Sequence, residues 1–103
     1  MAIASQTNDL QTVLDVLRAN LPQLTSTYKV KSLGVFGSQV RGGARSGSDL
    51  DILVEFDEAP TLFEFVRLQR QLSQLAATEV DLVMKSGLKP NVGERILREV
   101  VPV

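Results

Sequence analysis

The sequence predicts a mixed α/β fold of the α+β class, in which helices pack against a small sheet of parallel and antiparallel strands. Two apolar runs, residues 33–36 and 49–56, flank a glycine-rich corner and have the composition of strands. Because the connection between them is short, we expect these two strands to pair antiparallel. A third run, residues 79–84, follows a stretch of helical periodicity, so it should lie parallel to the second strand through a right-handed crossover.

The elements are expected in the order helix, helix, strand, strand, helix, strand, helix. Thr7 or Asn8 can cap the first helix, and Pro22 suits the first turn of a second, short helix. Thr61, with Glu64 three residues on, has the spacing of a capping box. The expected bounds are helices over about 8–19 and 22–28, a strand over 33–36, a helical turn over 38–41, a strand over 49–56, a helix over 62–77, a strand over 79–84 and a helix over 90–100.

Apolar residues at helical spacing predict which face of each helix is buried. The first helix has the stripe Leu10, Val13, Leu14 and Leu17. The long helix is expected to bury a broad face made of Leu62, Phe65, Val66, Leu68, Leu72, Leu75 and Ala76. In the last helix the residues expected to face inward are Ile96, Leu97 and Val100.

Length and composition exclude several kinds of protein. With 103 residues, the chain is expected to form one domain over residues 1–103. Eleven basic and twelve acidic residues give a net charge of −1, so we expect no direct nucleic-acid binding and no charge-driven membrane binding. The absence of cysteine and histidine excludes disulfides, zinc–thiolate sites and mechanisms that need imidazole. No apolar run approaches the ~20 residues of a membrane span, and no signal-peptide pattern is present, so a cytoplasmic location is the default expectation.

Paired carboxylates open the second strand. Side chains alternate along a strand, so Asp49 and Asp51 should point to one face with Cα atoms roughly 6.5–7 Å apart. Two like charges on one face repel, and a divalent cation would relieve that repulsion. If the third strand lies beside the second, Asp81 can join them, and three carboxylates suffice to bind two Mg²⁺ ions.

The corner before this strand has the features of a phosphate site. Gly37 and Ser38 stand where a strand ends and a helical turn begins, so main-chain N–H groups can approach a phosphate. Arg41 and Arg45 are placed to offset phosphate charge. The other common phosphate motifs, GxxxxGK[ST] and GxGxxG, are absent. A phosphate cradle beside metal-binding carboxylates is what phosphoryl or nucleotidyl transfer requires.

The motif as a whole resembles a known family. It consists of Gly37-Ser38-x-x-x-Gly42-x-Ala44-x-x-x-Ser48-Asp49-x-Asp51, followed by Asp81 in a Val-Asp-Leu-Val strand. This pattern is similar to that of the minimal nucleotidyltransferase (MNT) family in the DNA polymerase β superfamily, most closely the small MNT proteins encoded beside HEPN-domain toxins. Residues 88–99 also resemble theirs, so the likeness covers nearly the whole chain.

The resemblance implies a polymerase β-like nucleotidyltransferase fold that uses ATP and two Mg²⁺ ions to transfer AMP. In MNT–HEPN pairs it implies an antitoxin that adenylylates a tyrosine of the toxin, so a hetero-oligomer with a HEPN-domain toxin is expected. The nucleotide- and phosphate-binding residues carried over by the motif are Gly37, Ser38, Arg41 and Ser48. The metal-binding and catalytic residues are Asp49, Asp51 and Asp81.

Some positions depart from the family pattern. Gln39 stands where an aromatic residue is common, and Gly43 and Gly47 replace frequent polar residues. These changes loosen the loop that would contact the base or the phosphates, and the roles of Gln39 and Arg45 stay open.

Other interpretations stay open at this stage. The chain could neutralise a partner by binding alone, with a vestigial site, or it could modify a small hydroxylated molecule such as an antibiotic. Asp49 and Asp51 could also be ordinary turn and strand residues. Glu55 is interpreted as a solvated residue or a support for the metal ligands, and Tyr28 as a packing residue.

Overall fold

The computed structural model describes residues 10–37 and 50–103. The elements in these ranges are helix α1 (Leu10–Tyr28), strands β1 (Val30–Phe36) and β2 (Leu50–Phe56), helix α2 (Leu62–Ala76), strand β3 (Val80–Met84), a 3₁₀ turn η2 (Lys85–Gly87), helix α3 (Pro90–Glu99) and strand β4 (Val101–Pro102). The mixed α/β class predicted from the sequence is confirmed.

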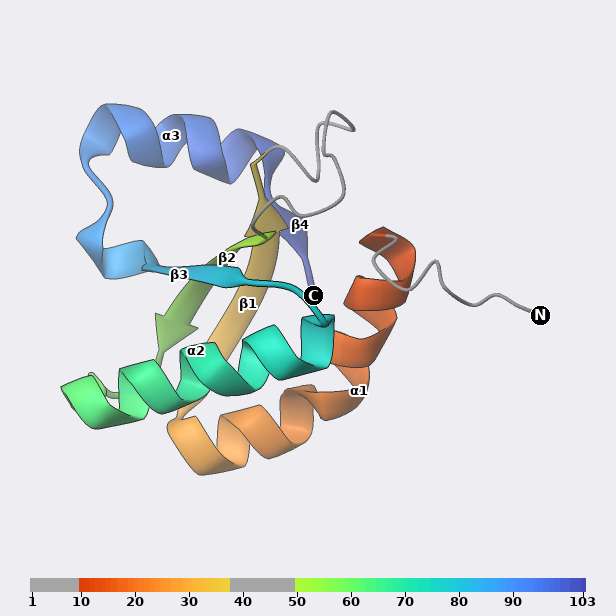
Figure 1. Cartoon of the computed structure of the whole chain (residues 1–103). Helices are drawn as coiled ribbons and strands as arrows, with labels where there is room; N and C mark the ends of the chain where they lie inside the picture. Colours follow the sequence, from red (N-terminus) through yellow and green to blue (C-terminus); the bar gives the residue numbers. More distant parts are fainter. Residues whose placement is uncertain (1–9, 38–49) are drawn as a thin grey trace.

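One sheet of strand order β3-β2-β1-β4 separates the helices of the described ranges into two layers. Helices α1 and α2 cover one face, and α3 lies over the other (Figure 1). Strand β1 pairs antiparallel with β2, and β2 pairs parallel with β3, as the connection lengths predicted. The pairing of β4 with β1, also antiparallel, was not predicted.

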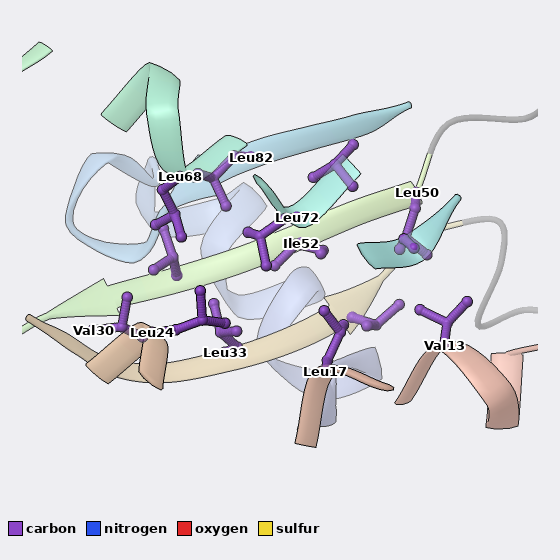
Figure 2. Close-up of a cluster of buried hydrophobic side chains, with 14 of the residues drawn as sticks. Val13, Leu17, Leu24, Val30, Leu33, Leu50, Ile52, Leu68, Leu72 and Leu82 are labelled. Atoms are coloured by element: carbon purple, nitrogen blue, oxygen red, sulfur yellow. The ribbon is translucent and has the colours of Figure 1, made fainter. Parts of the chain in front are cut away.

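The main core lies between the sheet and the pair α1 and α2 (Figure 2). Leu50, Ile52 and Val54 of β2 are fully buried in it, as strand alternation predicted. From α2 the buried residues are Leu68, Leu72 and Ala76. These positions repeat every four residues and form a narrow stripe along the helix.

The prediction that α2 buries a broad apolar face was wrong at the N-terminal end of the helix. Leu62 is 77% exposed, Val66 is 38% exposed, and the neighbouring Phe63 is 83% exposed. At 3.6 residues per turn, Val66 lies about 200° around the helix axis from Leu68. It therefore cannot face the sheet when Leu68 does, and the first turn of α2 carries exposed apolar surface.

Helix α1 is one continuous helix with Pro22 inside it, so the predicted division into two helices was wrong. The helix changes direction part-way along, as expected for proline, which removes a hydrogen bond and costs about 3 kcal/mol (Figure 1). Leu17 and Leu24, on either side of the proline, are both fully buried against the sheet. Burying each leucine contributes about 1.5–3 kcal/mol, which offsets that cost.

Strand β1 begins three residues earlier than predicted and contains a bulge. Val30 pairs with Phe56 and Ser32 with Glu55, so Lys31 is an extra residue in the ladder. The bulge changes the alternation. Val30 and Leu33, an odd number of positions apart, therefore both face the main core.

A second, smaller cluster lies under α3 and contains Phe36, Leu53 and Ile96. Leu97 was predicted to face inward, but it is 47% exposed, because Ile96 occupies the position directed at the sheet. The chain then returns to the sheet beside Gly34, where a Cβ atom would overlap the side chain of Val100. No helix in the described ranges is long and apolar enough to cross a lipid bilayer.

Candidate active site

Two of the predicted carboxylates lie side by side in the sheet. Asp51 on β2 and Asp81 on β3 are directly paired in the parallel ladder. Paired residues on adjacent strands, about 4.8 Å apart, project to the same face. The flanking residues Leu50, Val80 and Leu82 belong to the main core, so the two aspartates project to the face over which α3 lies. Asp51 is half-buried there and Asp81 is exposed.

Gly37 lies against the Asp51 carboxylate. Gly37 follows Phe36, the residue of β1 that pairs with Asp51, and has a φ of 87°. A Cβ atom on Gly37 would overlap an oxygen of that carboxylate. Both the left-handed backbone and the close approach require glycine. The main chain just after β1 is therefore in direct contact with the Asp51 carboxylate.

A further carboxylate, Glu99 at the end of α3, reaches this corner. Its Oε1 atom accepts a hydrogen bond from the Gly37 N–H at 3.3 Å. The sequence reasoning did not single out Glu99, because a glutamate in the last turn of an amphipathic helix has the pattern of a solvated residue. The contact arises from the return of the chain into β4, which was itself not predicted.

The structure thus brings together three of the predicted site residues, Gly37, Asp51 and Asp81. The remaining ones, Ser38, Arg41, Ser48 and Asp49, lie outside the described residues, as do Gln39 and Arg45. Within residues 10–37 and 50–103, no group of three or more acidic side chains is close enough to hold a metal ion without another ligand.

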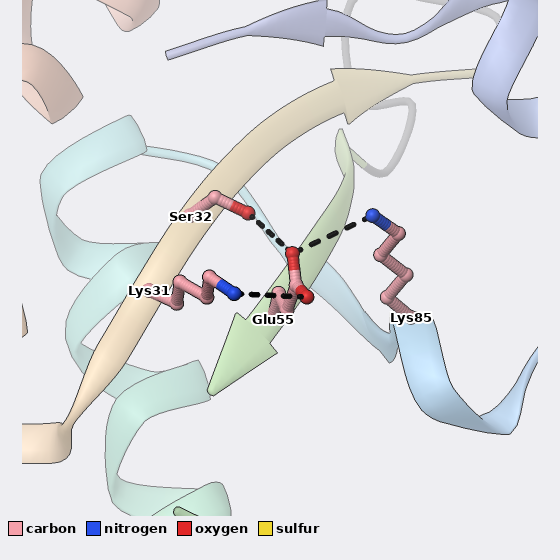
Figure 3. A network of polar contacts seen from close by, with 4 residues as sticks. All are labelled: Lys31, Ser32, Glu55 and Lys85. Carbon is pink, nitrogen blue, oxygen red and sulfur yellow. Dashed lines mark hydrogen bonds and ion pairs between the residues drawn. The ribbon is translucent and has the colours of Figure 1, made fainter. Parts of the chain in front are cut away.

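Glu55 lies on the same face of β2 as Asp51, but about 13 Å farther along the strand. It accepts a hydrogen bond from Ser32 Oγ at 3.3 Å and forms ion pairs with Lys31 at 3.9 Å and Lys85 at 3.5 Å (Figure 3). Two lysines therefore offset its charge. This carboxylate ties β2 to β1 and to the turn after β3, and it does not contact the acidic pair.

Comparison with known proteins identifies the family. Residues 14–103 match the model of the nucleotidyltransferase domain family. The chain is 46% identical over 94 residues to the protein adenylyltransferase MntA of Thermococcus cleftensis, covering 91% of this chain and 95% of that protein. It is 40% identical to a candidate protein adenylyltransferase of Methanocaldococcus jannaschii, covering 88% of this chain and 94% of the relative.

Solved structures share the fold. A candidate minimal nucleotidyltransferase that is 41% identical superposes with a TM-score of 0.77, covering 92% of this chain and 96% of that one. A toxin–antitoxin complex with AMP-PNP contains a chain that matches with a TM-score of 0.65 at 20% identity, covering 96% of this chain and 72% of that one. The second likeness is one of fold alone. The polymerase β-like fold expected from the motif is confirmed, and the chain belongs to the nucleotidyltransferase domain family as a homologue of the protein adenylyltransferase MntA.

Proposed function

We propose that this chain is a Mg²⁺-dependent protein adenylyltransferase that transfers AMP from ATP to a tyrosine hydroxyl of a HEPN-domain toxin and thereby acts as its antitoxin. One observation carries the proposal. Asp51 and Asp81 project side by side, and the Gly37 main chain lies against Asp51. This arrangement occurs in a chain that is 46% identical to a protein adenylyltransferase.

The donor set suits magnesium. Asp51 and Asp81 offer carboxylate oxygens, the ligands that Mg²⁺ prefers, from two strands whose register is fixed by the sheet. Asp49 is proposed as the third ligand, so that the three carboxylates hold two ions. Bound Mg²⁺ would neutralise phosphate charge and stabilise the charge that develops during transfer.

The proposed roles of the remaining residues follow from where the triphosphate would lie. Gly37, Ser38, Arg41 and Ser48 are proposed to contact the phosphates, because main-chain N–H groups and guanidinium groups bind anions. The toxin hydroxyl oxygen forms a bond to the α-phosphorus of ATP, and the bond from that phosphorus to the bridging oxygen breaks. Pyrophosphate leaves with that oxygen, and the hydroxyl proton passes to the Asp81 carboxylate.

Relatives of the same fold support the choice of partner. One solved complex contains a tri-AMPylated HEPN toxin of Shewanella oneidensis bound to an MNT antitoxin. The matched chain is 20% identical to this one, with a TM-score of 0.58, and supports the proposal through its fold only. If the gene next to this chain's own encodes a HEPN-type protein, that protein is the acceptor to test first.

The test is transfer of label from [α-³²P]ATP. The chain, Mg²⁺ and the neighbouring gene's product are incubated together, and label on the product is expected. Asp49→Asn combined with Asp51→Asn should abolish labelling, and so should Asp81→Asn. Asp57→Asn, in an exposed turn after β2, is the matched control and should label normally.

The same experiment distinguishes an adenylyltransferase from a chain that neutralises the toxin by binding alone. If the double variant still protects cells from the toxin although neither protein carries label, the chain neutralises by binding, and the proposal that AMP transfer makes it an antitoxin is wrong. If label appears on a small hydroxylated molecule and not on the toxin, the acceptor class is wrong.

A further inference from the structure

Two side chains of α2 bind the outer edge of β3 at the residue before Asp81. Gln69 Nε2 donates a hydrogen bond to the Val80 carbonyl oxygen at 2.9 Å. Ser73 Oγ accepts a hydrogen bond from the Val80 N–H at 3.1 Å. Both main-chain groups of Val80, whose side chain is fully buried, are therefore held by one helix.

The Ser73 hydroxyl is fixed for this role. It donates its own hydrogen to the Gln69 carbonyl oxygen at 3.0 Å, so a lone pair is directed toward the Val80 N–H. Two hydrogen bonds therefore link two adjacent turns of α2 to one residue of β3, and the third joins Ser73 to Gln69 within the helix. We call Gln69 and Ser73 the α2 clamp.

The α2 clamp binds β3 along the edge that has no neighbouring strand among the described residues. In the described sheet β3 is an edge strand, bordered by β2 alone, and an edge strand has one row of main-chain groups without a strand partner. On the inner side, the Leu50 N–H donates to the Glu79 carbonyl oxygen at 2.9 Å. The clamp supplies the matching bonds on the outer side.

The position of these bonds matters for Asp81. The Val80 carbonyl and the Asp81 N–H belong to one planar peptide unit. Gln69 therefore fixes the plane from which the Asp81 Cα–Cβ bond departs. Because Asp81 is exposed, no surrounding side chains hold it by burial, and its direction depends on its backbone.

We propose that Gln69 and Ser73 are positioning residues for nucleotidyl transfer, which hold the Asp81 carboxylate in register beside Asp51 through the Val80 peptide groups. This inference rests on the proposed function. Side chains that orient metal ligands from outside the coordination sphere typically alter activity or metal affinity about 10- to 100-fold when replaced.

The chain contains a matched comparison within the same helix. Gln71, two residues after Gln69, accepts a hydrogen bond at 3.0 Å from the hydroxyl of Tyr28, a buried residue of α1. Both glutamines join α2 to another element by one partly buried hydrogen bond. Gln69 contacts the strand that carries Asp81, whereas Gln71 contacts helix α1, which is far from Asp81 in the sequence.

The experiment compares Gln69→Met and Ser73→Ala with Gln71→Met and with Gln74→Met, whose side chain is exposed. Methionine keeps the length of glutamine and removes its amide. Four quantities are measured for each variant: the melting temperature, kcat and KM for AMP transfer, and Mn²⁺ affinity by electron paramagnetic resonance titration. Ser73→Thr, which keeps the hydroxyl, is the rescue variant.

Gln69→Met and Ser73→Ala are expected to lower kcat and Mn²⁺ affinity about 10- to 100-fold. Their KM for ATP should change less than about 3-fold, because the contacts proposed for the triphosphate are elsewhere. Gln71→Met should lose similar thermal stability while keeping kcat and Mn²⁺ affinity, and Ser73→Thr should restore most of the activity.

The proposal is overturned if Gln69→Met matches Gln71→Met in kcat and Mn²⁺ affinity, since the clamp would then contribute stability alone. Failure of the proposed function is distinct, because the unaltered chain would transfer no AMP. In that case the Mn²⁺ titration, which needs no turnover, still decides whether the clamp positions Asp81.

Discussion

The main chain of Gly37 packs directly against the carboxylate of Asp51, with no room between them for a Cβ atom. Gly37 directly follows β1, and Asp51 lies near the start of β2, so this contact joins the beginning of the glycine-rich corner to the acidic pair. Its geometry follows from the antiparallel register, in which Phe36 is paired with Asp51. One residue predicted to bind phosphate, Gly37, and one predicted to bind metal, Asp51, are therefore in contact.

Replacing Gly37 with alanine should reduce AMP transfer and stability together. The left-handed backbone costs an alanine about 1–2 kcal/mol, and the new methyl group would displace the Asp51 carboxylate. Displacing a reacting group by about 1 Å can cost roughly 100-fold in rate, so a loss of that order in kcat is expected. Gly87→Ala is the control, because a Cβ there meets nothing within 4 Å. Equal activity of the two variants would contradict the close packing of Gly37.

Two leucines of α2 should differ sharply when truncated. Leu68→Ala removes a fully buried side chain from the main core and should cost about 2–5 kcal/mol of unfolding free energy. Leu62→Ala removes a side chain that is 77% exposed and should change stability by no more than about 0.5 kcal/mol. Urea denaturation measures both, and a large loss for Leu62→Ala would mean that this residue is buried in solution.

The contribution of the α2 capping box to the free energy of unfolding should be measurable by itself. Thr61 Oγ1 accepts a hydrogen bond from the Glu64 N–H at 3.1 Å, and Glu64 Oε1 accepts one from the Thr61 N–H at 2.8 Å. Thr61→Ala should cost about 0.5–2 kcal/mol, whereas Thr61→Ser keeps the hydroxyl and should cost less. Thermal unfolding of the two variants checks this, and identical melting temperatures would argue against the cap.

The ion pairs of Glu55 should matter little to stability and nothing to catalysis. Lys31 and Lys85 are both well exposed, and exposed ion pairs contribute about 0–1 kcal/mol. Glu55→Gln should therefore lose at most about 1 kcal/mol, with a smaller loss at ~1 M salt. AMP transfer should stay at the level of Glu58→Gln, a variant in the exposed turn after β2. A strong loss of transfer would place Glu55 in the active site after all.

Strands β1, β2 and β3 and their directions were predictable because local rules decide them. Alternation in residues 50–56 identified the buried face, and connection length fixed the pairing of β2 with β1 and β3. The pairing of Asp51 with Asp81 follows once β2 and β3 are parallel and start together. The cap at Thr61 was predictable for the same reason, since its hydrogen bonds span three residues.

The features that were missed depend on distant parts of the chain. Proline disfavours a helix locally, and burial of Leu17 and Leu24 on either side of Pro22 offsets that local cost. Strand β4 has two residues, one of them proline, too few for any alternation to be visible. The contact of Glu99 with Gly37 spans 62 residues and depends on that return of the chain.

The two faces of the sheet are stabilised unequally, and this has a consequence for motion in the native state. Among the described residues, three buried side chains form the cluster under α3, whereas sixteen form the core under α1 and α2. Segments with fewer buried contacts open at lower free energy than the whole protein unfolds. Amide hydrogens of α3 should therefore exchange with deuterium sooner than those of α1 and α2. Such sub-global opening would move Glu99 away from the Gly37 N–H while the strands that bear Asp51 and Asp81 stay folded.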